Sequence, residues 1–227
     1  MTFSRALCSA GSLATALAAA CSTADAVPLP DPAPSAFVSS TAKLDTAVFA
    51  GGCFWGIEAV YRHIRGVTSS VSGYAGGSAV NPSYEEVSSG STGHAEAVRV
   101  IYDPAVVSYG TLLKVFFSVA HDPTELNRQG PDVGTQYRSA IFFRDSLQAK
   151  GARDYIVQLG AAKVFRSPIV TEIKALARFY VAEDYHQNYL ALHPTQPYIV
   201  YNDLPKIEAL KREFASIYRD DGIAAQR

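Results

Sequence analysis

The sequence contains very little sulfur. Its 227 residues include three cysteines and one methionine, Met1. Cys8 and Cys21 lie near the N-terminus, and no cysteine follows Cys53. A domain stabilised by disulfides needs paired cysteines, so that class of small exported protein is excluded. The lone thiol of the later chain, Cys53, therefore needs a different explanation.

The chain also lacks an excess of either charge. The 20 Lys and Arg residues face 21 Asp and Glu residues, which gives a formal net charge of -1. A surface for nucleic acid or for an acidic membrane would need a clear positive excess. We therefore expect no nucleic-acid partner.

A hydrophobic run long enough to span a membrane in the mature protein is missing as well. Residues 6–20 are uncharged and rich in Ala and Leu, but this run is too short for a membrane helix. A preceding Arg5 and the small-x-small sequence at residues 24–26 make residues 1–26 typical of a secretory signal peptide. We expect export to the periplasm. Anchoring through a lipid on Cys21 is the alternative.

The rest of the chain divides into three parts. Residues 27–43 carry prolines at positions 28, 30, 32 and 34, which predicts an extended, unpacked linker. Residues 44–220 have the composition and length of one globular domain, and residues 221–227 form a C-terminal tail.

Strand and helix patterns alternate irregularly within this domain, which indicates an α+β fold with helices covering a mixed sheet. The predicted strands cover residues 47–50, 67–74, 96–102, 139–143 and 169–173. A short helix is predicted after Ser83, and longer helices over residues 54–64, 108–117, 145–159, 182–192 and 204–218.

Residues 50–56, AGGCFWG, join the first strand to the first helix. The two glycines break the strand, and Gly66 is placed to cap the far end of the helix. Cys53 falls at the helix N-terminus, where free N–H groups and the macrodipole favour an anion. We therefore expect its thiol to ionise more readily than a free thiol and to act as a nucleophile. A small buried hydrophobic residue is the alternative.

His94 and Glu96 match the H-x-E half of the zinc deaminase signature. The other half requires two cysteines downstream, and none follows Cys53, so that zinc site cannot be built. The other histidines have no partner at a spacing typical of metal ligands. We expect structural or solvated histidines and no metal.

Six motifs in a fixed order carry a more specific signal. They are residues 52–56 (GCFWG), 73–77 (GYAGG), 92–98 (TGHAEAV), 121–123 (HDP), 134–139 (GTQYRS) and 182–187 (AEDYHQ). Together they resemble the A-type peptide methionine sulfoxide reductases over residues 46–218. The resemblance implies a two-layer α/β sandwich related to the ferredoxin-like plait. It also implies reduction of the S epimer of methionine sulfoxide, with no bound metal or cofactor.

The resemblance assigns the chemistry to two residues. Reduction needs a soft nucleophile at the sulfoxide sulfur and a proton at its oxygen. Cys53 would be the nucleophile and would end as a sulfenic acid, while Glu96 would be the acid, with its pKa raised by an apolar setting. Phe54 and Trp55 would cradle the S-methyl group of the substrate. They could also form a hydrophobic staple at the helix start.

Three polar residues complete the implied substrate site. Tyr84, Tyr137 and Asp132 would hydrogen-bond or orient the sulfoxide oxygen and the acid, because phenol O–H groups suit a developing negative charge. Without the resemblance, the tyrosines would be interpreted as packing residues and Asp132 as a turn former.

The chain departs from this family near its C-terminus, where many relatives carry resolving cysteines and this sequence has none. We therefore expect an external thiol to reduce the Cys53 sulfenic acid, from a thioredoxin-like or glutathione-linked donor. The expected enzyme is a monomer that acts on oxidised proteins or on free methionine sulfoxide.

Two other functions compete with this interpretation. One is a thiol peroxidase that uses Cys53 on hydroperoxides, which would consume hydrogen peroxide without forming methionine from the sulfoxide. The other is a non-enzymatic binder of oxidised or unfolded chains, in which Cys53→Ser would leave the function intact.

Overall fold

The computed structural model describes residues 28–33 and 43–222. The predicted signal peptide with Cys21 lies outside the described residues, as do residues 34–42 of the predicted linker and residues 223–227 of the predicted tail.

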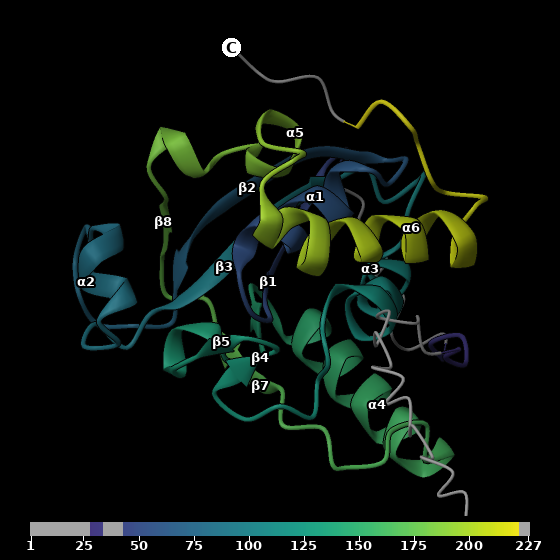
Figure 1. The fold of residues 1–227 in the computed structure, drawn as a ribbon. Helices are drawn as coiled ribbons and strands as arrows, with labels where there is room; N and C mark the ends of the chain where they lie inside the picture. The colour runs from purple at the N-terminus through teal and green to yellow at the C-terminus, as the bar shows by residue number, and fades with distance from the viewer. Residues whose placement is uncertain (1–27, 34–42, 223–227) are drawn as a thin grey trace, which may run out of the picture.

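A six-stranded mixed sheet runs through the described domain (Figure 1). Its order is β7-β6-β1-β3-β2-β8, and its one parallel pair is β6 with β7. The strands are β1 (Asp45–Ala50), β2 (Val67–Ala75), β3 (Ala95–Tyr102), β6 (Ala140–Phe143), β7 (Glu172–Ala175) and β8 (Phe179–Val181). A separate hairpin, β4 (Arg128–Gln129) and β5 (Asp132–Val133), lies in the polar stretch between residue 120 and β6.

Helices pack against this sheet, and three of them begin at side-chain caps close to the predicted starts. Ser83 forms a capping box with Glu86, Ser108 accepts from the N–H of Thr111, and Asp145 accepts from the first turn of its helix. The helices are α1 (Phe54–Arg62), α2 (Tyr84–Ser88), α3 (Tyr109–Val115), α4 (Ser146–Ala162), α5 (Tyr189–Leu192) and α6 (Leu204–Glu213). A π-helical turn, Phe116–Ala120, continues α3.

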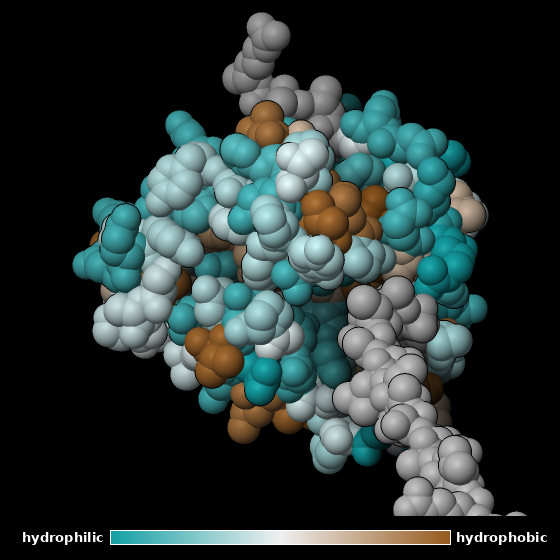
Figure 2. Space-filling model, in the orientation of Figure 1, coloured by the Kyte–Doolittle hydropathy of each residue, from teal (hydrophilic) through white to brown (hydrophobic). Residues whose placement is uncertain are grey.

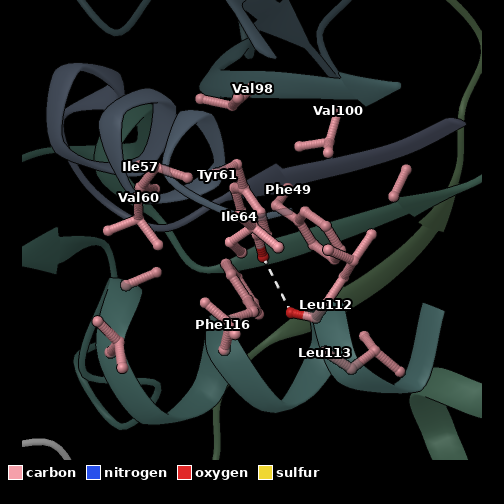
Figure 3. Packing of buried hydrophobic residues seen from close by; sticks show 14 of the residues in the cluster. Phe49, Ile57, Val60, Tyr61, Ile64, Val98, Val100, Leu112, Leu113 and Phe116 are labelled. Atoms are coloured by element: carbon pink, nitrogen blue, oxygen red, sulfur yellow. Dashed lines mark hydrogen bonds between the residues drawn. The ribbon is translucent and has the colours of Figure 1, made fainter. Parts of the chain in front are cut away.

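The main core lies between the helices and one face of the sheet (Figure 3). Phe49 of β1 stacks on Tyr61 of α1 with ring centroids 5.1 Å apart, and on Phe116 at 5.0 Å. The buried Tyr61 hydroxyl donates to the carbonyl of Leu112 at 3.1 Å, so burial leaves no unpaired O–H. A smaller core that includes Val48 covers the other face. This is the two-layer α+β arrangement that the sequence predicts.

Two predicted boundaries differ from the structure. Gly66 does not cap α1, which ends at Arg62; it forms the turn before β2 with a φ of 89°. The strand predicted over residues 169–173 is β7, which begins at Glu172 because its parallel pairing with β6 begins there.

The helix predicted over residues 182–192 is wrong. The chain instead forms a 3-10 turn, Asp184–His186, and Asn188 with a φ of 54° separates that turn from α5. The cause is tertiary, because the side-chain amide of Gln187 bonds to the N–H and the carbonyl of Ser72 on β2, each at 3.0 Å. The last helix also ends early, at Glu213 rather than residue 218, and β8 was not predicted.

Residues 28–33 pack on the domain, so the expectation of an unpacked linker is wrong for this part. Leu29 is buried, and the Tyr155 hydroxyl of α4 donates to the Pro30 carbonyl at 2.9 Å. Asp31 pairs with Lys114 of α3 at 2.6 Å. Residues 28–33 therefore contact both α3 and α4.

The face shown in Figure 2 is mainly hydrophilic, with hydrophobic residues in small separate patches. Among the helices of residues 28–33 and 43–222, none is both long and apolar enough to cross a bilayer.

Candidate active site

Cys53 lies between the Gly51-Gly52 turn and the first turn of α1, at the predicted N-cap position. Gly52 has a φ of 96°, and a Cβ there would come within 2.6 Å of the Gln129 side chain. A Cβ on Gly56 would lie 2.1 Å from Oδ1 of Asp203. Glycine at these positions thus lets a side chain of the β4–β5 hairpin and a buried carboxyl close around Cys53.

All the predicted site residues meet in one cavity of about 280 Å³. They come from β3, β5, the 3-10 turn Thr135–Tyr137 that follows β5, and the starts of α1 and α2. The predicted residues that line it are Cys53, Phe54, Trp55, Tyr84, Glu96, Asp132 and Tyr137. Residues far apart in sequence are therefore brought within reach of a single small ligand.

Glu96 has the protonation behaviour that an acid needs. Its side chain is 2% exposed, and burial raises its pKa to about 8, with a further rise from Asp132. The N–H of Phe54 donates to Oε2 of Glu96 at 3.0 Å, which opposes that rise. Glu96 therefore holds a proton near neutral pH, next to the start of α1.

The expectation that Cys53 ionises readily is wrong for this structure. Burial raises the pKa of the Cys53 thiol well above its usual range, and the carboxyls of Glu96 and Asp203 raise it further. The helix terminus acts in the predicted direction through the Trp55 N–H, and Lys206 also favours the thiolate, but burial outweighs both. The thiol is thus both buried and at a helix N-terminus.

Aromatic side chains form one wall of the cavity. The Trp55 ring stacks on Tyr189 with centroids 3.7 Å apart, and its indole N–H donates to Nδ1 of His186 at 3.1 Å. Phe54 is almost completely buried and contacts the rings of Tyr74 and His186. Trp55 is fixed by these contacts and lines the cavity, whereas Phe54 lines the cavity and also belongs to the main core.

The three predicted polar residues lie where they can act on a ligand oxygen. Burial raises the pKa of Tyr84 and of Tyr137, so both phenols keep their protons. Asp132 accepts a hydrogen bond from the Tyr198 hydroxyl, and burial raises its pKa. The cavity therefore offers O–H donors next to the Glu96 carboxyl.

Four residues near Cys53 were not assigned by sequence. Tyr198 and Gln196 line the same cavity, while Asp203 pairs with Lys206 at 3.1 Å beside the first turn of α1. Asp203 is fully buried, and its Oδ2 has no hydrogen-bond partner among the described residues. The one sequence signal was the polar Asn-Asp pair within an apolar stretch at residues 198–204.

The histidines have structural contacts. His94 accepts from the Gly77 N–H through Nδ1 at 3.1 Å, and its Nε2 lies 2.8 Å from the Ala79 carbonyl. His121 is half-buried, its ring lies between the Phe116 carbonyl and the Ser139 hydroxyl, and desolvation lowers its pKa to about 4. Within the part of the chain that the structure describes, no group of three or more His, Cys, Asp or Glu side chains could hold a metal ion.

Known proteins resemble this chain over most of its length. The family model described as Peptide methionine sulfoxide reductase matches residues 45–217. The chain is 56% identical over 176 residues to the Peptide methionine sulfoxide reductase MsrA 2 of Mesorhizobium japonicum, covering 78% of this chain and 90% of that protein. It is 52% identical over 178 residues to the Peptide methionine sulfoxide reductase MsrA of Deinococcus radiodurans, with coverage of 78% and 86%.

Two solved structures share the fold. Methionine sulfoxide reductase A of Corynebacterium diphtheriae matches with a TM-score of 0.58 and 38% identity, covering 76% of this chain and 86% of that one. Reduced Mxr1 of Saccharomyces cerevisiae matches with a TM-score of 0.61 and 35% identity, covering 70% and 91%.

Proposed function

The chain belongs to the peptide methionine sulfoxide reductase family, and we propose that it reduces the S epimer of methionine sulfoxide through Cys53 and Glu96. As a member of this family it is an oxidoreductase that converts methionine sulfoxide back to methionine, which repairs oxidised proteins.

The cavity supports a definite orientation of the substrate. Its volume of about 280 Å³ suits a methionine sulfoxide side chain with part of its backbone. The S-methyl group would lie against Trp55, since sulfur and methyl groups pack favourably on aromatic rings. The sulfoxide oxygen would then face Glu96 and the hydroxyls of Tyr84 and Tyr137, which donate hydrogen bonds to it.

The proton balance of the first step can be met by Cys53 and Glu96. Glu96 gives its proton to the sulfoxide oxygen as the Cys53 sulfur attacks the sulfoxide sulfur, and the resulting carboxylate takes up the thiol proton. The net change is transfer of one oxygen atom. Methionine leaves as the thioether, and Cys53 becomes a sulfenic acid. A thiol that stays protonated at rest suits this sequence, because its proton is released only when Glu96 can accept it.

The second half of the cycle needs a thiol from another molecule. Cys53 is the one cysteine within residues 28–33 and 43–222, and the sequence has no cysteine after it. A disulfide within the domain is therefore not possible. A thioredoxin-like or glutathione-linked donor would reduce the sulfenic acid, and the protein itself needs no bound cofactor.

The observation that carries this proposal is the meeting of seven side chains from separate segments around Cys53 and a protonated Glu96. The test is an assay driven by dithiothreitol on the two separated epimers of a methionine sulfoxide derivative. We expect the parent to reduce only the S epimer, Cys53→Ser to be inactive, and Glu96→Gln to be strongly impaired. Activity toward only the R epimer, or full activity of Cys53→Ser, would contradict the proposal.

We also propose that the protein works in the periplasm. The support is the signal-like composition of residues 1–26. N-terminal sequencing and mass measurement of the protein from a periplasmic fraction would test this. A chain that begins at residue 27 is expected, and a lipid-modified Cys21 would contradict soluble export.

A further inference from the structure

Cys53 lines a second, larger cavity of about 610 Å³ that the reduction of methionine sulfoxide does not use. This cavity lies among the Cys53 turn, the loop before and after β4, the chain just after α4, and the start of α6. Of the residues around the smaller cavity, it shares Cys53 and Tyr198. Cys53 therefore borders two spaces that are lined by different side chains.

The proposed function requires that a thiol from outside the protein reaches Cys53, and a second cavity beside Cys53 could admit it. After each turnover the sulfenic acid must meet an external thiol, and the larger cavity borders Cys53 without Trp55, Glu96 or the other residues assigned to the sulfoxide. The larger cavity falls within the range of about 300–1,000 Å³ that is typical of sites for small molecules. It is large enough for a small thiol compound but not for a folded protein.

One cationic side chain in the lining of this cavity is free to bind an anionic group. Arg166 is exposed, and no ion-pair or hydrogen-bond partner is found for it in residues 28–33 and 43–222. Of the two acidic residues in the lining, Glu125 pairs with Arg128 at 3.4 Å and accepts from the Gly130 N–H at 2.7 Å. Asp122 accepts from the N–H and the hydroxyl of Thr124 at 2.8 and 2.6 Å. Lys206 also lines the cavity and pairs with Asp203 at 3.1 Å, so Arg166 is the cation that remains to bind an incoming anionic group.

We propose that this second cavity binds a low-molecular-weight thiol that carries a carboxylate, and that this thiol reduces the Cys53 sulfenic acid. The carboxylate pairs with Arg166 while the thiol sulfur attacks the Cys53 sulfur. An S–S bond forms, the S–O bond breaks, and the oxygen leaves as water with the proton of the attacking thiol. A second molecule of the thiol then attacks the mixed disulfide, which releases a small disulfide and restores the Cys53 thiol.

The test measures the two half-reactions separately. Methionine formation is followed in a single turnover of the reduced protein without any thiol. The oxidised protein is then freed of methionine and mixed with 3-mercaptopropionate, 2-mercaptoethanol or cysteamine, which are anionic, neutral and cationic. Each rate is divided by the rate of the same thiol with a small reference disulfide, which removes differences in intrinsic reactivity.

Arg166→Glu should lower the normalised rate for 3-mercaptopropionate relative to 2-mercaptoethanol by about fivefold at low salt, the size expected for reversal of one exposed charge contact. Methionine formation should be unchanged. The matched control is Arg153→Glu, which makes the same charge change on an exposed part of α4 that does not line the cavity. It should leave the ratio unchanged, and an equal effect of both variants would overturn the proposal.

Ser167→Trp fills part of the same cavity and provides a test that does not depend on charge. It should slow reduction by all three thiols and leave methionine formation unchanged. Unchanged thiol rates in this variant, or fast reduction by a thioredoxin-like protein that neither variant affects, would overturn the proposal. Failure of the proposed function would look different, because no methionine would form in the first measurement.

Discussion

Glu96 and Glu58 are both buried carboxyls, but only Glu96 lines the cavity around Cys53. Burial raises the pKa of Glu96 to about 8 and that of Glu58 to about 7. An acid catalyst must be protonated, so activity that depends on Glu96 is present below its pKa and lost above it. We expect kcat/KM for the S sulfoxide to fall as the pH rises through about 8.

Variants of the two carboxyls separate catalysis from burial. Glu96→Gln should lower kcat/KM by about 10²- to 10⁴-fold, the range for loss of a general acid, and should abolish the fall near pH 8. Glu58→Gln should keep both the activity and the pH profile of the parent. A parent-like rate for Glu96→Gln would show that Glu96 is not the acid. A flattened pH profile for Glu58→Gln would show that Glu58, not Glu96, is the group that titrates.

Lys206 is the cation that offsets the buried carboxyls near Cys53. Lys206→Met should raise the pKa of the Cys53 thiol and slow its alkylation by iodoacetamide at fixed pH by about three- to tenfold, because one pKa unit is a tenfold change in thiolate. Lys211→Met is the control, since Lys211 lies on the same helix with an exposed side chain that pairs with Asp220. Faster alkylation of Lys206→Met would contradict this electrostatic role.

Sequence motifs were enough to bring the predicted site residues together, but not to give the ionisation of Cys53. Its position at a helix N-terminus is local and could be predicted from the Gly-Gly break. Asp203, whose carboxyl raises the pKa of Cys53, and the β4–β5 hairpin, which packs on Gly52, come from distant parts of the chain. The sign of the pKa change therefore needed the tertiary structure.

At the scale of the helices, replacing each of two helical glycines by alanine is expected to change stability in opposite directions. Gly56 lies in α1, where a Cβ would lie 2.1 Å from Oδ1 of Asp203, whereas nothing lies within 4 Å of a Cβ on Gly160 of α4. Gly56→Ala should lower the free energy of unfolding by about 1–3 kcal/mol through overpacking. Gly160→Ala should raise it by about 0.5–1 kcal/mol, because Ala favours helix over Gly.

Urea unfolding of both variants checks this pair. Destabilisation by Gly160→Ala of the same size as by Gly56→Ala would show that backbone conformation, not the approach of Asp203, is the cause. If Gly56→Ala has the same free energy of unfolding as the parent, Asp203 can move away from α1 at little cost.

Elements set by local signals were predicted correctly, and those set by distant contacts were not. The starts of α2, α3 and α4 follow from caps at Ser83, Ser108 and Asp145, which act within one turn. The chain over residues 182–192 has a helical pattern but is held along β2 by Gln187. No local pattern shows that contact.

At the scale of the whole molecule, residues 28–33 contribute to stability. Leu29 is 8% exposed, so Leu29→Ala should lower the free energy of unfolding by about 2 kcal/mol, the lower end of the range for buried leucines. Leu147→Ala, on α4 but 56% exposed, should change it by less than about 0.5 kcal/mol. Equal effects in chemical unfolding would show that the segment does not pack on the domain in solution.

The central claim is that the oxygen of methionine sulfoxide passes to Cys53. The most direct test mixes reduced protein with an excess of the S epimer, without any thiol, and measures methionine and the mass of the Cys53 peptide. We expect one methionine per Cys53, a gain of one oxygen atom that a sulfenic-acid reagent captures, and no reaction with the R epimer. Methionine formation that leaves Cys53 unmodified would contradict the account.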